Sequence, residues 1–131
     1  MCGGTYKKWE TPRQLLEING ESIVGRTIRL LKEQGIDYND IVITSNDDRF
    51  LQFGLMMWRH DNQYVANGLD DIKGQWCDCF YPTNMPACYL MGDVIFSRNA
   101  IKTIIETETA DIEFFASSPP FADNYCKGHA E

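Results

Sequence analysis

The chain lacks any long apolar run. None of its 131 residues belongs to a stretch near the roughly 20 apolar residues that a membrane-spanning helix needs. The first residues also lack the apolar segment of a secretory signal. We therefore predict a cytoplasmic protein that does not enter a membrane.

Positive charge is scarce. Twelve Lys and Arg residues stand against 19 Asp and Glu residues, for a net charge of -7. A surface of this sign repels nucleic acid and anionic membranes, so neither is an expected partner. A ligand that carries phosphate would need a local basic site.

Cysteines are present without a disulfide framework. Their number, five, is odd, and they follow no framework spacing: Cys2, Cys77, Cys79, Cys88 and Cys126. We expect free thiols in a reducing compartment. A single residue separates Cys77 from Cys79, which is the wrong spacing for a zinc knuckle and favours packed thiols over metal binding.

What is present fits one globular domain. The chain is 44% hydrophobic and 24% charged, and it is long enough for one core. We find no internal repeat and therefore treat residues 1–131 as a single domain.

The first residues combine glycine with positive charge. Gly3-Gly4-Thr5 precedes Lys7 and Lys8, and Thr11-Pro12-Arg13 follows. Glycines let backbone N–H groups approach an anion closely, and Lys or Arg neutralises the remaining charge. This pattern predicts a loop that holds polyphosphate, although two lysines alone are more often solvated surface.

Two segments have helical periodicity. Over residues 21–34, apolar side chains recur at helical spacing, and Gly35 is expected to end the helix: Ile23, Val24, Thr27, Ile28 and Leu31. Ser97 is the expected N-cap of a second helix over residues 98–107. Its apolar face comprises Ala100, Ile101, Ile104 and Ile105.

Several short apolar runs predict strands. Residues 15–18 form an extended piece closed by a turn at Asn19-Gly20, and residues 41–45 form a β-branched run. Further strands are expected at 55–58, 87–91 and 112–116. Strand 15–18, helix 21–34 and strand 41–45 in that order predict a βαβ unit with a parallel sheet, hence an α/β fold.

A later segment, Tyr89-Leu90-Met91-Gly92-Asp93-Val94, places Gly-Asp at the end of a predicted strand. Together with the N-terminal loop, Asn19-Gly20 and the helix at 21–34, it resembles the nucleotidyltransferase family. That family includes the sugar-phosphate and molybdenum-cofactor-type NTP transferases. The resemblance implies a Rossmann-like fold with an open, mostly parallel sheet flanked by helices. It also implies transfer of a nucleoside monophosphate from an NTP to a sugar phosphate or similar phosphorylated acceptor, with release of pyrophosphate.

The resemblance also assigns roles to residues. Lys8 and Arg13 would be catalytic, and Asp93 would hold Mg²⁺. The base and ribose would be bordered by seven positions: Cys2, Gly3, Gly4, Thr5, Ser45, Asn46 and Gly74.

The chain departs from the family pattern at several points. Tyr6 replaces a glycine of the loop, Lys8 stands for the family's Arg, and Pro12-Arg13 stands for Pro-Lys. Only Met1-Cys2 represents the first strand, and the region of the acceptor contacts lies beyond the last residues. We therefore expect a shortened family member, with self-association into a homo-oligomer through its open sheet edge.

Other functions are less well supported. A non-catalytic nucleotide-binding or scaffold domain of this fold is the main alternative. A dinucleotide-binding oxidoreductase would need G-x-G-x-x-G, which Gly3-Gly4-Thr5-Tyr6 does not match.

Overall fold

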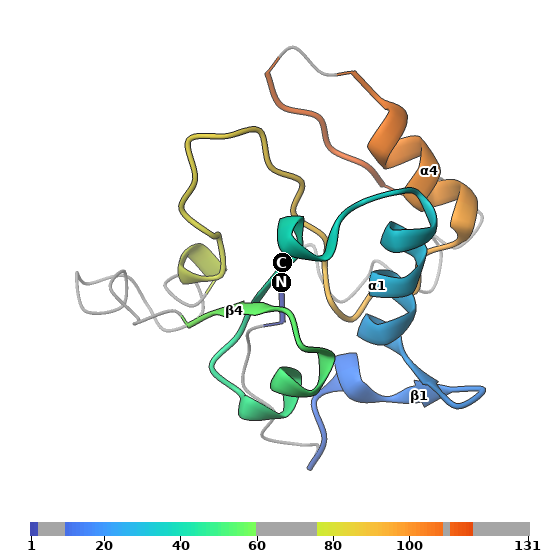
Figure 1. Cartoon of the computed structure of the whole chain (residues 1–131), viewed down its shortest axis with the longest axis vertical. Helices are drawn as coiled ribbons and strands as arrows, with labels where there is room; N and C mark the ends of the chain where they lie inside the picture. Colours follow the sequence, from blue (N-terminus) through green and yellow to red (C-terminus); the bar gives the residue numbers. More distant parts are fainter. Residues whose placement is uncertain (3–9, 60–75, 109–110, 117–131) are drawn as a thin grey trace, which may run out of the picture.

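The computed structural model describes residues 1–2, 10–59, 76–108 and 111–116 (Figure 1). Five of the predicted site residues lie outside these ranges: Gly3, Gly4, Thr5, Lys8 and Gly74.

A small hairpin precedes the first helix. After the 3-10 turn η1 (Arg13–Leu15), β1 (Glu17–Ile18) pairs antiparallel with β2 (Glu21–Ser22). The turn residues Asn19 and Gly20 have φ values of 55° and 79°, the left-handed conformation that tight hairpins require. The predicted turn is confirmed. The predicted βαβ unit is wrong, because β1 returns on β2 and does not pair with residues 41–45.

Helix α1 (Ile23–Glu33) has well-formed ends. The Ser22 Oγ accepts a hydrogen bond from the Gly25 N–H at 3.1 Å. At the other end the Gly35 N–H donates to Lys32 O and the Ile36 N–H donates to Leu31 O. This paired arrangement with Gly35 at φ 88° terminates helices efficiently, so the predicted helix and its stop are confirmed.

Strands β3 (Val42–Thr44) and β4 (Met56–Trp58) pair in parallel, with Ile43 opposite Met57. The 3-10 turn η2 (Tyr38–Asp40) leads into β3. The longer 3-10 helix η3 (Asp48–Phe53) connects β3 to β4, and the Asp47 side chain caps it by accepting from the Arg49 N–H. Both strands were predicted, and the crossover between them is shorter than a usual α-helical one.

Residues 1 and 2 extend this arrangement. The Met1 ammonium donates to Leu90 O at 2.6 Å, and the Gly92 N–H donates to Met1 O at 2.9 Å. Two bonds that flank one residue in this way are the pattern of a parallel bridge. On the other side, the Cys2 N–H donates to Thr44 O at 2.9 Å. The backbone neighbours therefore run in the order β4, β3, residues 1–2, residues 90–92.

Two predicted strands are wrong. Residues 87–91 form no regular strand, and residues 87–89 are exposed. The physical reason is that a strand needs a neighbour along its length, whereas Met1 supplies the only parallel bridge described there. Residues 112–116 also form no strand, and Ile112 and Phe114 are 76% and 89% exposed.

The core lies between α1 and the parallel strands. Its buried members come from five parts of the chain: Cys2, Val24, Ile28, Ile41, Ile43, Phe50 and Leu55. Helix α4 (Arg98–Glu106) lies beside α1 and buries Ile101 completely (Figure 1). The Ser97 side chain caps α4 by accepting from the Ala100 N–H, as predicted.

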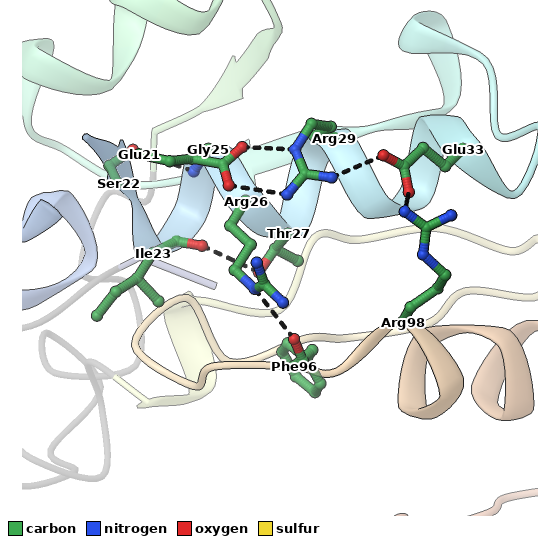
Figure 2. Close-up of polar contacts among 10 residues, drawn as sticks. All are labelled: Glu21, Ser22, Ile23, Gly25, Arg26, Thr27, Arg29, Glu33, Phe96 and Arg98. Atoms are coloured by element: carbon green, nitrogen blue, oxygen red, sulfur yellow. Dashed lines mark hydrogen bonds and ion pairs between the residues drawn. The ribbon is translucent and has the colours of Figure 1, made fainter. Parts of the chain in front are cut away.

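A chain of charges crosses the outer surface of α1 (Figure 2). Arg29 pairs with Glu21 at 2.7 Å and with Glu33 at 2.6 Å, and Arg98 of α4 reaches the second oxygen of Glu33 at 2.8 Å. The hydrogen bonds from Arg29 hold the pKa of Glu21 below its usual range. Glu33 therefore joins the two helices.

Aromatic contacts pack the segment that begins at residue 76 against the end of β4. The Trp58 and Tyr81 rings meet edge to face with centroids 5.4 Å apart, and Phe80 meets Tyr89 at 4.9 Å. The Tyr89 hydroxyl also donates to Tyr81 O at 2.7 Å. These contacts bring the stretch before Gly92 close to β4.

Candidate functional site

The candidate site is the edge of the parallel strands where their carboxyl ends meet. In open α/β sheets, ligands bind outside these ends. Ser45 follows β3 directly and is buried; its N–H donates to Trp58 O, and its Oγ accepts from the Asp47 N–H at 3.1 Å. Because Cys2 bonds to Thr44 and Gly92 bonds to Met1, the predicted residues Cys2, Ser45 and Asp93 gather at this edge.

Gly92 is where the backbone segments approach most closely. A Cβ atom at this position would lie 2.5 Å from Cys2 Sγ, 2.7 Å from Met1 O and 3.0 Å from Gln14 Cγ. Any side chain would therefore collide with neighbouring backbone. The absence of one lets residues 1–2 and η1 pack against the turn that presents Asp93.

Two predicted site residues meet across this turn. The Arg13 Nη2 lies 3.3 Å from the Asp93 Oδ2, and the two side chains are 60% and 32% exposed. An ion pair this exposed contributes about 0–1 kcal/mol, so either partner can exchange the other for a ligand at small cost. The structure therefore brings together a cation and a carboxylate to which the resemblance gives complementary roles.

The chain after Asp93 is held by α1. The Arg26 Nε donates to Phe96 O at 3.3 Å, as Figure 2 shows, and α4 begins two residues later. This contact fixes the far end of the segment that starts at Gly92.

Two residues with unsatisfied polar groups, Gln14 and Thr44, lie next to Cys2. Within the described ranges, three buried side-chain atoms have no hydrogen-bond partner: Gln14 Oε1, Thr44 Oγ1 and Asp78 Oδ2. Gln14 packs with Cys2 around Gly92, and the backbone carbonyl of Thr44, not its hydroxyl, accepts the Cys2 N–H. Sequence reasoning missed Gln14, because a glutamine between Arg13 and Leu15 follows no recognisable pattern.

The Cys2 thiol is held neutral. Burial raises the pKa of Cys2 to about 11; the N-terminal ammonium opposes this effect, and the electrostatic influence of Asp93 and of Cys79 adds to it. A neutral thiol is a poor nucleophile, so the Cys2 thiol is poorly suited to nucleophilic attack.

Asn46 marks the β3 side of the edge. It is exposed, and its carbonyl oxygen accepts from Arg59 Nη1 at 3.3 Å. Arg59 also pairs with Asp48 of η3. Arg59 is a cation near the site to which the sequence assigns no role. Its closeness to Asn46 follows from the pairing of β3 with β4, which the sequence does not show.

The donor set at Asp93 suits a hard cation with few protein ligands. Within the part of the chain that the structure describes, no three His, Cys, Asp or Glu residues converge as a metal cluster. Mg²⁺ commonly takes one or two carboxylates and completes its shell with phosphate oxygens and water. Asp93 offers one such carboxylate, which Arg13 pairs with at 3.3 Å.

No helix within the described ranges is long and apolar enough to cross a membrane. No protein-family model, no curated protein and no solved structure matches this chain.

Proposed function

We propose that the chain is a nucleotidyltransferase-type domain that binds an NTP with Mg²⁺ at this edge. It moves the nucleoside monophosphate to a sugar phosphate or similar phosphorylated acceptor and releases pyrophosphate. The observation that carries this proposal is the ion pair between Arg13 and Asp93, presented beside Gly92 at the carboxyl ends of the parallel strands.

The backbone order supports a Rossmann-like sheet. The backbone neighbours run in the order β4, β3, residues 1–2, residues 90–92, so residues 1–2 have a central position. The chain first adds β3 and β4 on one side of residues 1–2 and then adds residues 90–92 on the other side. Open α/β sheets bind ligands at the point where the strand order changes side in this way.

The chemistry requires charge neutralisation more than covalent participation. Attack of an acceptor phosphate on the α-phosphorus gathers several negative charges, so positioning and cations account for most of the catalysis. Arg13 would hold the α-phosphate and the incoming phosphate, and Lys8, outside the described residues, would face the departing pyrophosphate. Asp93 would hold Mg²⁺, which, when bound, neutralises phosphate oxygens.

The test is calorimetric titration of each of the four NTPs with and without Mg²⁺. We expect one NTP to bind more tightly with Mg²⁺, and Asp93→Asn to abolish that gain without lowering the melting temperature. A matched titration with sulfate is the control. If no NTP binds better than sulfate, the proposal fails.

A non-catalytic nucleotide-binding domain is the second candidate. It is favoured because no three His, Cys, Asp or Glu side chains converge among the described residues, whereas phosphoryl transfer commonly uses two metal ions. Release of pyrophosphate from a bound NTP in the presence of a mixture of sugar phosphates would exclude it. The free thiols of Cys77 and Cys88 support a reducing, cytoplasmic location for either function.

A further inference from the structure

Arg49 joins two stretches that lie far apart in the sequence. Its guanidinium forms a fork on the Asp47 carboxylate, with Nε 2.9 Å from Oδ1 and Nη2 2.5 Å from Oδ2. The Nη1 of the same group donates to Glu10 O at 2.7 Å. Because Glu10 stands three residues before Arg13, Arg49 ties the approach to Arg13 to the loop that follows β3.

Asp47 gives Arg49 a well-defined support at the candidate edge. The Asp47 N–H donates to Ser45 Oγ at 3.1 Å, and its carboxylate accepts the Arg49 N–H at 3.0 Å as the cap of η3. The hydrogen bonds from Arg49 also hold the pKa of Asp47 below its usual range, so the carboxylate is ionised at neutral pH. The Glu10 carbonyl is therefore connected to Ser45, a predicted site residue, through two side chains.

Residues 10–13 are held on two sides of the strand edge. Arg49 fixes their first residue on the β3 side, and the pair with Asp93 fixes their last residue on the side of residues 90–92. These sides lie two strand spacings apart, about 10 Å, because residues 1–2 lie between them, and three residue steps reach about the same distance. Residues 10–13 therefore cross the strand ends where the strand order changes side, the place at which open α/β sheets bind ligands.

A phosphate ligand affects these two anchors differently. A phosphate that binds Arg13 displaces Asp93 from the guanidinium, since both are anions and the ion pair is exposed. The contact of Arg49 with the segment persists, because its charge is already neutralised by its own carboxylate partner. Of the two polar anchors, Arg49 then holds residues 10–13, while the buried Pro12 ring holds their middle in both states.

We propose that Arg49 is a positioning residue for phosphate binding: it holds residues 10–13 across the strand ends, so that Arg13 meets a phosphate of the NTP, and does not itself contact the ligand. This inference rests on the proposed function, which supplies the phosphate. The Arg49 and Asp47 side chains are 46% and 20% exposed, and a pair this exposed contributes little to stability. The effect of Arg49 is therefore expected in ligand affinity and not in folding.

Tripolyphosphate is the probe, because it carries the phosphates of an NTP without base or ribose. Its affinity is measured by calorimetry in the presence of Mg²⁺ for the unmodified protein, Arg49→Gln and Arg29→Gln. Arg29→Gln is the matched control, because it removes the same charge from an exposed guanidinium that forms a similar fork, on Glu21, at 2.7 and 2.8 Å. We expect Arg49→Gln to bind about tenfold more weakly, since the segment must then be ordered upon binding, and Arg29→Gln to bind as the unmodified protein does.

Asp47→Ser tests the support of Arg49 by the sign of its effect. Serine still caps η3, but it cannot hold the guanidinium fork. We expect tripolyphosphate to bind several-fold more weakly, although the change removes a negative charge that would repel the ligand. Asp37→Ser is the control, because Asp37 caps η2 in the same way, by accepting the Asn39 N–H at 2.8 Å, and its loss should not weaken binding. Tighter binding by Asp47→Ser would overturn the proposal, because the freed Arg49 would then contact the ligand directly.

Two further results would overturn the role of Arg49 alone. One is an Arg49→Gln protein that binds tripolyphosphate as tightly as the unmodified chain. The other is a loss of affinity that is accompanied by a lower melting temperature than that of Arg29→Gln, which would assign Arg49 to the fold. If an NTP binds and tripolyphosphate does not, the same variants are measured with that NTP. If the unmodified protein binds neither tripolyphosphate nor any NTP better than sulfate, the proposed function itself fails.

Discussion

Gly92 lets three segments of the chain pack closely: its own turn, residues 1–2 and η1. A methyl group there would lie 2.7 Å from Met1 O, which is backbone and cannot rotate away. We expect Gly92→Ala to lower the free energy of unfolding by about 1–3 kcal/mol, as overpacking usually does. Urea unfolding followed by circular dichroism measures this.

Cys2→Ala tests the same contact from its other side. It removes the Sγ that would lie 2.5 Å from the new methyl group, while the contact with Met1 O remains. The Gly92→Ala change should therefore cost less in the Cys2→Ala background than in the unmodified protein. An equal cost in both backgrounds would show that the backbone moves and that Cys2 is not part of the constraint.

The ion pair between Arg13 and Asp93 competes with ligand binding. Asp93 occupies the place of the phosphate that Arg13 would bind, and Arg13 occupies the place of the cation that Asp93 would bind. Asp93→Asn frees the guanidinium, so pyrophosphate without Mg²⁺ should bind up to about fivefold more tightly, the equivalent of about 1 kcal/mol. Calorimetry with pyrophosphate measures the change, and Asp111→Asn, in the exposed stretch after α4, is the control. Weaker binding by Asp93→Asn would contradict the competition between ion pair and ligand.

The Cys2 thiol makes stability depend on alkaline pH. Its pKa is about 11 in the folded protein and 9.0 without burial, so the unfolded chain loses this proton first. The neutral Cys2 thiol therefore contributes its full stabilisation to the folded state below pH 9, and this stabilisation is lost as the pH rises through 11. The loss amounts to about 2–3 kcal/mol.

A comparison with Cys2→Ser isolates this effect, because serine does not titrate in that range. We expect the difference in unfolding free energy between the two proteins to shrink as the pH rises from 8.5 to 11. A constant difference would mean that the folded thiol ionises as easily as the unfolded one.

At the scale of elements, the charges between α1 and α4 are exposed but connected. Glu33→Gln breaks the contacts with both Arg29 and Arg98, and we expect a loss of about 1 kcal/mol that diminishes in high salt. The control is Glu106→Gln, whose partner Lys102 lies in the same helix at 3.8 Å. Equal losses for the two variants would show that Glu33 does not join the helices.

Elements with local signals were predictable from the sequence. The end of α1 depends on Gly35 and the start of α4 on Ser97, and each acts on residues three or four positions away. The start of α1 at Ile23, by contrast, was expected two residues earlier, because the pairing of Glu21 and Ser22 in β2 was not foreseen. The strand at 87–91 was predicted wrongly because its apolar residues have the right composition, while pairing depends on distant partners. The same limit applies to Gln14, which is buried and packs against Gly92 in a different part of the chain.

The site was predictable only in part for a related reason. The structure brings Arg13 and Asp93 together as a cation and a carboxylate, and their roles toward phosphate and Mg²⁺ stay predictions. Arg59 could not be assigned, because its place beside Asn46 follows from the parallel pairing of β3 and β4.

At the scale of the whole molecule, the residues after α4 leave apolar side chains in water. Phe114 is 89% exposed and Ile112 is 76% exposed, although the net charge of -7 opposes association. We expect concentration-dependent self-association that strengthens with salt. Phe114→Ser should suppress it without changing the melting temperature, because this side chain contributes little to the core.

Sedimentation velocity at low and high salt measures this association. Glu113→Ser, one residue earlier in the same stretch, is the matched control and should not suppress association. A monomer at all concentrations and salt levels would contradict the expectation.

The ring contact between Trp58 and Tyr81 has a practical consequence. An indole held edge-on to a phenol in a fixed environment gives a near-ultraviolet dichroic band that vanishes when the packing is lost. Trp58 ends β4, and its carbonyl accepts the N–H of Ser45, so this chromophore adjoins the proposed ligand edge. One optical signal can therefore report unfolding when the protein is heated and occupancy of the edge when a ligand is added.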